Sequence, residues 1–127
     1  MELQIVERKS SKVNKLVRQH FGPHEDLWNP KCCDMVFRLS PYGSTEPYAV
    51  CTLQLAPGDY WILGDLCVKE SGKGYGTQIV GLIMRVVNRP VWVDANEIAA
   101  KIFAKDPRFR ETNTGPWEIT GRAFISS

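Results

Sequence analysis

The chain has 127 residues, a formal net charge of +2, and 43% hydrophobic and 24% charged residues. This length and balance are typical of one compact domain that buries roughly two thirds of its unfolded surface, so we expect a single domain over residues 1–127. No run of about eighteen apolar residues occurs, which argues against a membrane-spanning helix, and the charge is too small for the footprint of a nucleic-acid-binding protein.

The start of the sequence predicts a strand, a helix and a loop. Residues 3–7 alternate apolar and polar side chains, as a short strand does. The serine pair at 10–11 can cap a helix whose apolar stripe covers residues 13–21. Residues 21–30 contain one glycine and two prolines, which indicates a loop, and we regard it as a candidate substrate-side loop.

Three strands are predicted next, over residues 34–39, 48–55 and 60–68. Turns rich in proline, glycine and serine separate them, so they are expected to form an antiparallel meander. Residues 91–93 predict a short apolar strand that follows a helical crossover and pairs in parallel with residues 60–68.

The most informative segment runs from residue 65 to residue 77. An apolar strand leads into three alternating glycines, Gly72, Gly74 and Gly76, which can take positive φ and admit a ligand close to the backbone. Behind them, apolar residues recur at helical spacing and predict a helix from about residue 77 to about residue 88. The free amides at the start of this helix, together with the charge of Lys73, predict an anion site.

The glycine spacing distinguishes this segment from two common phosphate-binding loops. A P-loop requires a lysine between its last glycine and the following Ser or Thr, whereas Thr77 follows Gly76 directly. The dinucleotide pattern Gly-x-Gly-x-x-Gly also fails, because the spacing here is Gly-x-Gly-x-Gly and the segment lies past the middle of the chain. Neither loop type therefore describes this segment.

The last third of the chain predicts a helix and a closing hairpin. Asp94 or Asn96 can cap a helix that extends to about residue 104. Residues 108–111 and 117–125 can form the hairpin, with Gly121 as a bulge. The order of elements predicts an α/β protein built on a mixed sheet.

Two motifs resemble those of the GCN5-related N-acetyltransferases, the GNAT superfamily. The first comprises Leu66, Val68, Ser71, Gly74 and Gly76. The second comprises Asn96, Ala99, Phe103 and Phe109. Ser71 departs from the pattern, because the family has Arg or Gln there. The resemblance covers the whole chain, with specific motifs between residues 60 and 109 and by topology alone before them.

The resemblance implies a central, mostly antiparallel sheet with a splayed parallel strand pair and helices on both faces. It also implies binding of an acyl-CoA, usually acetyl-CoA, and transfer of the acetyl group to an amine of a protein or small molecule. Many members of the family form dimers, so the resemblance is also compatible with a homodimer of this chain. The residues that it assigns to the cofactor are Leu66, Cys67, Val68, Gly72, Lys73, Gly74, Tyr75, Gly76, Thr77, Asn96 and Phe103.

Catalysis by this chain would need a proton acceptor for the amine. Asp65 is the best candidate, because burial on a central strand would raise the pKa of its carboxyl group; alternation would place it on the same face as Leu63 and Cys67. A purely structural carboxylate is the alternative. Phe103 stands where the family commonly has a tyrosine, and a phenyl ring cannot donate a proton. Weaker candidates for the base are Tyr60, Tyr75 and Asp94.

The cysteines and the start of the sequence indicate a cytoplasmic protein without a metal site. The charged first four residues lack the basic and apolar regions of a signal peptide. An adjacent cysteine pair and two cysteines in predicted strands are a poor disulfide framework, so we expect reduced thiols at Cys32, Cys33, Cys51 and Cys67. Adjacent cysteines point apart, which argues against zinc at His20, His24, Cys32 and Cys33.

Two other functions stay open at this point. Ser71 and Phe103 are compatible with a regulatory protein that binds acyl-CoA without efficient chemistry. Basic residues concentrated after residue 84 are compatible with a scaffold that contacts a protein or a nucleic acid, although a solvated basic face is the favoured interpretation.

Overall fold

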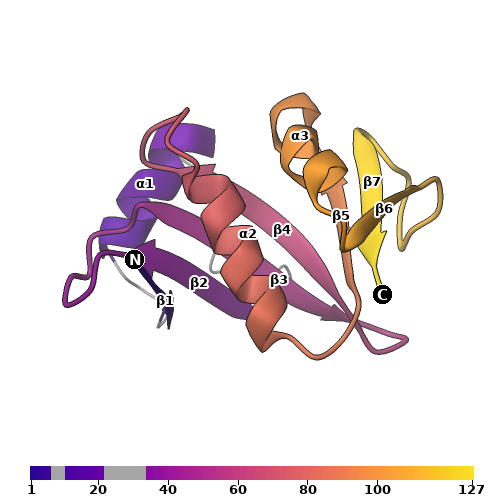
Figure 1. Ribbon diagram of the computed structural model, residues 1–127, viewed down its shortest axis with the longest axis horizontal. Coiled ribbons are helices and arrows are strands. Elements are labelled where there is room, and N and C mark those ends of the chain that lie inside the picture. Colours follow the sequence, from indigo (N-terminus) through magenta and orange to yellow (C-terminus); the bar gives the residue numbers. More distant parts are fainter. Residues whose placement is uncertain (7–10, 22–33) are drawn as a thin grey trace.

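The computed structural model describes residues 1–6, 11–21 and 34–127. Its elements, coloured by position along the chain in Figure 1, are β1 (Glu2–Ile5), α1 (Ser11–Phe21), β2 (Met35–Ser40), β3 (Ala49–Ala56), β4 (Tyr60–Val68), α2 (Tyr75–Val86), β5 (Val91–Ala95), α3 (Glu97–Lys105), β6 (Phe109–Thr112) and β7 (Arg122–Ser126). None of the helices in these ranges has the length and apolar character needed to cross a membrane.

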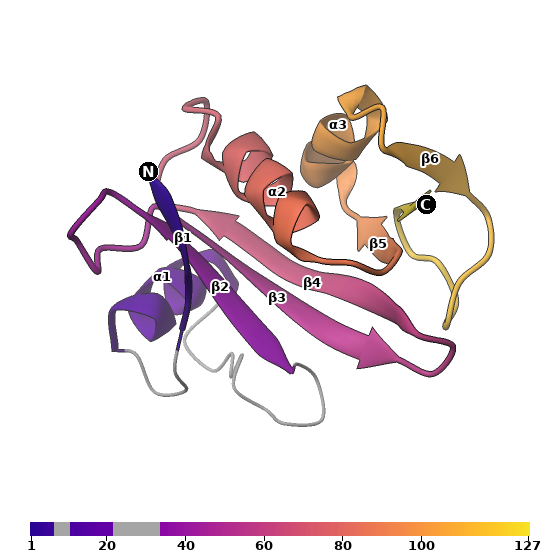
Figure 2. The same cartoon turned by 60° about the horizontal axis from the view of Figure 1, so that its bottom comes forward.

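The described strands form one seven-stranded sheet in the order β1-β2-β3-β4-β5-β7-β6. Neighbouring strands are antiparallel except for β4 and β5, which are parallel and joined through α2. The predicted meander, the parallel pair and the mixed sheet are therefore confirmed. Figure 2 shows α2 and α3 on one face of the sheet and α1 on the other.

Helix packing defines two faces of the sheet. On the α2–α3 face, Ile79, Ile83 and Phe103 are fully buried in the main core with the inward side chains of β2, β3, β5 and β7. On the α1 face, Val13, Leu16 and Val17 pack against β2, β3 and Cys67 of β4. Apolar side chains at helical and strand spacing thus bury both faces, as their periodicity predicts.

One extra residue in β4 changes the alternation of its side chains. The antiparallel register with β3 pairs Cys51 with Leu66 but Leu53 with Leu63, so β4 has one more residue than β3 over this stretch. As a result, Leu63 belongs to the α2–α3 core and Cys67 to the α1 core. The expectation that Asp65 shares a face with both residues is wrong for Leu63, because simple alternation ignores the bulge.

Several predicted boundaries also differ from the structure. Helix α2 begins at Tyr75, two residues before the predicted start, and ends at Val86. Strand β7 begins at Arg122, so the predicted strand over 117–125 is wrong in its first part. Phe21, the first residue of the predicted substrate-side loop, is the last residue of α1, and residues 22–30 of that loop lie outside the described residues. The residues of the rejected zinc site beyond His20 also lie outside them.

Candidate functional site

The β4–α2 loop, residues 69–74, presents the start of helix α2 to solvent. Gly72 and Gly74 both have φ of +76°, the left-handed region that glycine enters without strain. Gly74 is the N-cap residue, no side chain caps the helix, and its first turn contains no acidic residue. The first amides of α2 therefore remain available at the positive end of the helix dipole, beside the exposed Lys73.

Contacts at both ends hold this loop in place. The amide of Lys69 donates to the carbonyl of Tyr48 at 2.8 Å, and its ammonium lies 4.5 Å from the centre of the Tyr48 ring. At the other end of the loop, the ring of Tyr75 packs edge-on against the ring of Tyr48, with their centroids 5.2 Å apart. The aromatic pair joins the first residue of α2 to the β2–β3 connection, so the loop is anchored before any ligand arrives.

Gly76 has a different role from the other two glycines. It is buried within the first turn of α2, and a Cβ added there would lie 2.9 Å from Cδ1 of Ile102 on α3. The expectation of positive φ is confirmed for Gly72 and Gly74, but positive φ is not recorded at Gly76. This glycine lets α2 and α3 pack closely, so that both helices border the loop.

A cleft of about 850 Å³ opens where β4 and β5 part; we call it the splay cleft. The two strands pair only from Trp61–Val91 to Leu63–Val93. Beyond that point the lining includes Asp65 from β4, Asn96 after β5 and Phe103 from α3. Because the lining contains side chains from both faces of the sheet, the cleft passes through the sheet between the two strands.

The bulge in β4 explains where the strands part. Gly64 lies at the bulge, and a Cβ there would overlap Oγ1 of Thr52 on β3. Only glycine lets β4 approach β3 so closely while its backbone turns away from β5. Past Leu63, the edge of β4 that faces β5 has no strand partner within the described chain, which leaves backbone groups near Leu66 open toward the cleft.

The two carboxylates in the lining have different surroundings. Asp94 accepts hydrogen bonds from the amide of Thr120 at 2.9 Å, from its hydroxyl at 3.2 Å and from the amide of Gly121 at 2.9 Å. This carboxylate joins β5 to the residues before β7, and its role is structural. Asp65 also lines the cleft, but its side chain is exposed. The expectation that Asp65 is buried, on which the predicted rise of its pKa depended, is therefore wrong.

Gly121 is needed for the same junction. A Cβ at this position would overlap the backbone carbonyl of Ala95, so the close approach of the chain to β5 requires glycine. The prediction of a strand bulge at Gly121 is wrong, because Gly121 lies before β7 begins. The hydrogen bonds to Asp94 hold residues 120 and 121 in a bend ahead of that strand.

Asn96 and Phe103 border the splay cleft from α3. Oδ1 of Asn96 accepts a hydrogen bond from the amide of Ala99 at 2.9 Å, so Asn96, and not Asp94, caps this helix. Phe103 is fully buried and packs edge-on against Phe109 at 5.0 Å and tilted against Phe124 at 6.0 Å. The core role considered for Phe103 in the sequence is confirmed.

The other candidate groups lie outside the chemistry of the cleft. Neither Tyr60 nor Tyr75 is among the described residues of its lining. Burial, with the charge of Asp65 adding to it, raises the pKa of the Cys67 thiol to about 12, and burial also raises that of Cys51. Both thiols are therefore protonated at neutral pH and serve as small core residues.

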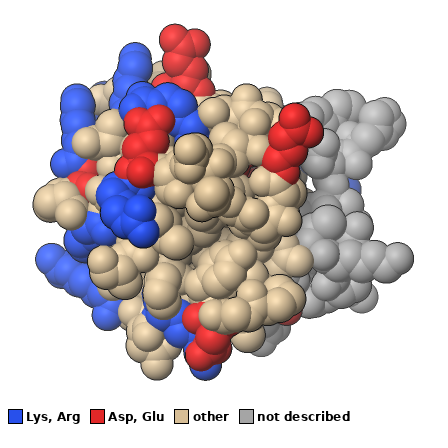
Figure 3. Space-filling model, turned by 90° about the vertical axis from the view of Figure 1, so that its right-hand side faces the viewer, with Lys and Arg blue, Asp and Glu red and all other residues tan. Residues whose placement is uncertain are grey.

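A second pocket of about 470 Å³ lies between the start of α2 and the end of α3. Its lining contains Thr77, Lys101, Lys105 and Arg108, with Asp106 beside them. The Arg108 guanidinium donates to both carboxylate oxygens of Asp106, at 2.9 and 2.7 Å, which lowers the pKa of Asp106 and fixes the arginine. Lys and Arg gather on one side of the molecular face in Figure 3.

Sequence reasoning missed several residues of these two pockets. Thr52, Gln54 and Trp117 line the splay cleft, but they come from β3 and from the connection between β6 and β7, and no local motif marks them. Lys101 and Lys105 border the second pocket; their spacing of four residues places them on the same side of a helix and was a usable signal.

Comparison of the whole chain with known proteins finds similarity in structure. No family model matches the sequence, and no curated protein matches it. A Bacillus subtilis acetyltransferase in complex with CoA superimposes with a TM-score of 0.71 at 12% identity, covering 99% of this chain and 97% of that one. An aminoglycoside 6′-N-acetyltransferase from Enterococcus faecium gives 0.66 at 13% identity, covering 99% and 96%. A Staphylococcus aureus acetyltransferase of the GNAT family gives 0.65 at 12%, covering 98% of each chain.

Proposed function

Because the chain has the fold of the GCN5-related N-acetyltransferases, we propose that it transfers an acetyl group from acetyl-CoA to an amine. The observation that carries this proposal is the junction of two sites. A short loop, residues 69–74, joins the open amides at the start of α2 to β4, and β4 itself forms one wall of the splay cleft. A long ligand with an anionic part and an extended arm fits that arrangement.

The residues present fit such a ligand in three places. The amides of residues 72–77 and the ammonium of Lys73 would hold a pyrophosphate. Open backbone groups of residues 66–68 would pair with the pantetheine arm, with Asn96 and Phe103 on the far wall. The second pocket, whose lining has three cations and one carboxylate, would receive the 3′-phosphate and nucleoside.

The proposed chemistry removes two protons from an acceptor that binds as an ammonium, one before its nitrogen attacks the thioester and a second, passed to solvent, as the amide forms. When bound, acetyl-CoA would supply an activated acetyl thioester. Asp65 would pair with the ammonium form of the acceptor and take a proton from it, directly or through one water, because it is the exposed carboxylate of the cleft. Phe103 cannot return a proton to the departing thiolate, so solvent is assigned that step.

The experiment compares two glycines that have the same backbone conformation. Gly74 and Gly43 both have φ of +76° and open space around an added Cβ, but only Gly74 lies in the β4–α2 loop. A valine at either position strains the backbone by about 1–3 kcal/mol, so both variants should melt at a similarly reduced temperature. Only Gly74→Val also blocks the approach of a ligand to the amides.

Acetyl-CoA should therefore raise the melting temperature of the wild type and of Gly43→Val, but not that of Gly74→Val. At a concentration of 100 times Kd, a ligand specific for the folded state adds about 2.7 kcal/mol of stability, which is readily measured. Absence of any shift with the wild type, or an equal shift in all three proteins, would contradict the cofactor assignment.

A second candidate is a protein of the same fold that binds acyl-CoA without efficient turnover. The full burial of Phe103 in an aromatic cluster favours it, because no hydroxyl is available at that position. Stabilisation by acetyl-CoA without release of free thiol across a panel of amines would support this alternative. For either function we propose a cytoplasmic location, in keeping with the free thiols of Cys51 and Cys67.

A further inference from the structure

The splay cleft and the second pocket have opposite charges. The charged side chains in the described lining of the splay cleft are Asp65 and Asp94, both acidic. The second pocket instead has Lys101, Lys105 and Arg108 with a single carboxylate. A cleft whose described charged groups are acidic favours a cation over an anionic acceptor, even though the whole chain has a net charge of +2.

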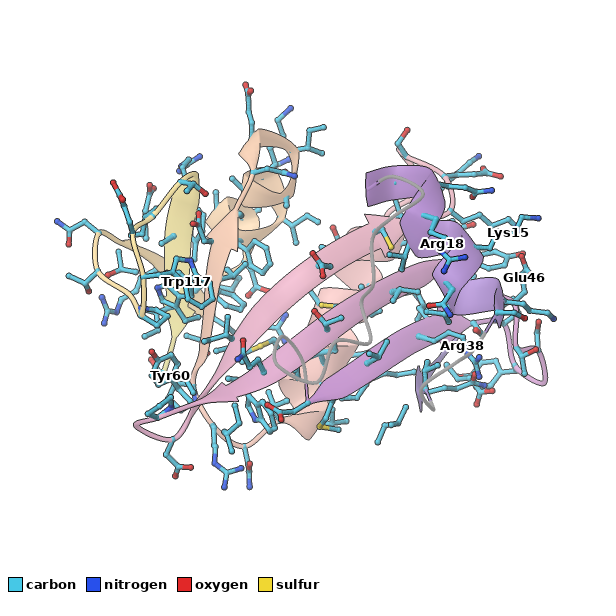
Figure 4. All side chains as sticks on the ribbon, turned by 180° about the vertical axis from the view of Figure 1, so that it is seen from behind. Lys15, Arg18, Arg38, Glu46, Tyr60 and Trp117 are labelled. Carbon is cyan, nitrogen blue, oxygen red and sulfur yellow. The ribbon has the colours of Figure 1, made fainter. Side chains whose placement is uncertain are left out.

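An exposed aromatic ring forms part of the same lining. Trp117 is 50% exposed and contributes to the wall of the splay cleft. Figure 4 shows it on the side of the sheet that carries α1, at the other end from that helix. A large apolar ring on a cleft wall offers a planar surface against which a flat ligand group can stack.

The position of Trp117 is fixed by neighbouring contacts. Its ring meets that of Trp92 edge-on at 5.2 Å, and Trp92 is buried, with its indole Nε1 donating to the carbonyl of Thr114 at 3.0 Å. At the other end of the connection, the amides of Thr120 and Gly121 are held by Asp94. The connection between β6 and β7 is thus tied to β5 on both sides of Trp117, and the ring is preorganised.

On the premise of the proposed function, we propose that the acceptor is a small primary amine with a planar aromatic body, whose ammonium group pairs with Asp65 and whose ring stacks on Trp117. Trp117 is then the specificity-determining residue of the cleft. An amine with a flexible aliphatic chain would make the same ion pair but would lose the stacking contact, which is worth about 0.5–1.5 kcal/mol beyond burial.

Three small probes separate the two contacts. Phenethylamine has both the ammonium and the ring, n-butylamine has only the ammonium, and phenethyl alcohol has only the ring. Chemical-shift titration of the isotope-labelled full chain gives a Kd for each probe, with and without CoA. We expect phenethylamine to bind about tenfold more tightly than either of the other two, which corresponds to about 1.4 kcal/mol.

Two substitutions then assign the contacts. Trp117→Leu keeps an apolar side chain against Trp92 but removes the flat face, so the preference for phenethylamine over n-butylamine should fall to about twofold. Asp65→Asn should abolish the preference for phenethylamine over phenethyl alcohol, since only the charged probe loses its partner. The controls are Tyr42→Ala, which removes a ring that is 78% exposed, and Asp59→Asn, which removes a surface carboxylate of the β3–β4 turn.

Each outcome bears on one assignment. Equal wild-type affinities for phenethylamine and n-butylamine, or an unchanged preference in Trp117→Leu, overturn the aromatic wall. An unchanged preference for amine over alcohol in Asp65→Asn overturns the ion pair. The titration without CoA decides the inference even if acetyl-CoA fails to bind, and in that case the proposed function fails separately. Tight binding of acetyl-CoA with no preference among probes would leave the proposed function standing and remove the inference.

Discussion

The β4–α2 loop and the splay cleft are adjacent but are built in different ways. The loop is a single run of residues whose binding groups are backbone amides, positioned by two left-handed glycines. The cleft takes its lining from β3, β4, β5, α3 and the connection before β7. The loop can therefore tolerate side-chain changes that spare its glycines, whereas the cleft depends on contacts between distant parts of the chain.

Charge follows the same division. The start of α2 and the neighbouring second pocket offer amides, lysines and an arginine, all suited to phosphate groups. The splay cleft offers the exposed carboxylate of Asp65, suited to an ammonium group. A protein that joins an anionic donor to a cationic acceptor gains from this separation, because each ligand is repelled from the site of the other.

The largest effect that would test this separation is expected for Asp65→Asn. If Asp65 acts only on the acceptor, kcat/KM for the amine should fall by about 100-fold or more, while the Kd of acetyl-CoA stays unchanged. Steady-state kinetics and calorimetry measure the two quantities. Asp59→Asn, which removes an exposed carboxylate of the β3–β4 turn outside the loop and both pockets, should change neither. A parallel loss of acetyl-CoA affinity in Asp65→Asn would show that the two sites are not separate.

A smaller effect is expected at the bulge that opens the cleft. Gly64→Ala places a methyl group against Oγ1 of Thr52 and should lower the free energy of unfolding by about 1–3 kcal/mol, as overpacking typically does. Adding Thr52→Ala removes the overlapping atom and should restore most of that loss. Adding Thr52→Val puts a methyl group in its place and should restore none. Urea unfolding of the variants measures these differences, and equal recovery by both second substitutions would contradict the contact.

The same contrast explains what the sequence could predict. Glycine spacing, the apolar stripe of α2 and the Asn96 cap are local signals, so the loop, its helix and the fold class followed from a short stretch of sequence. The change in side-chain alternation at Gly64 is not a local signal, because the extra residue of β4 can be recognised only from its pairing with β3. The exposure of Asp65 could not be predicted for that reason.

Trp117 and Gly121 show the same limit at the other wall. Their segment alternates well enough to predict a strand over residues 117–125, but the carboxylate of Asp94 holds the amides of residues 120 and 121 and delays the strand to Arg122. Trp117, in the connection before this strand, lines the cleft. A side chain of β5 thus decides the conformation of a segment 26 residues later, through a contact that periodicity does not report.

The smallest effect is expected in the second pocket. If Lys101, Lys105 and Arg108 contact the 3′-phosphate of CoA, their combined replacement by alanine should weaken CoA by about tenfold, because exposed charge pairs contribute modestly. Dephospho-CoA lacks that phosphate, so its Kd should change by less than about twofold. Arg110→Ala, at an exposed residue of β6 outside this lining, provides the matched control. An equal loss for both ligands would mean that the cations act through the pyrophosphate at the loop, and the loop and the second pocket would then form one site.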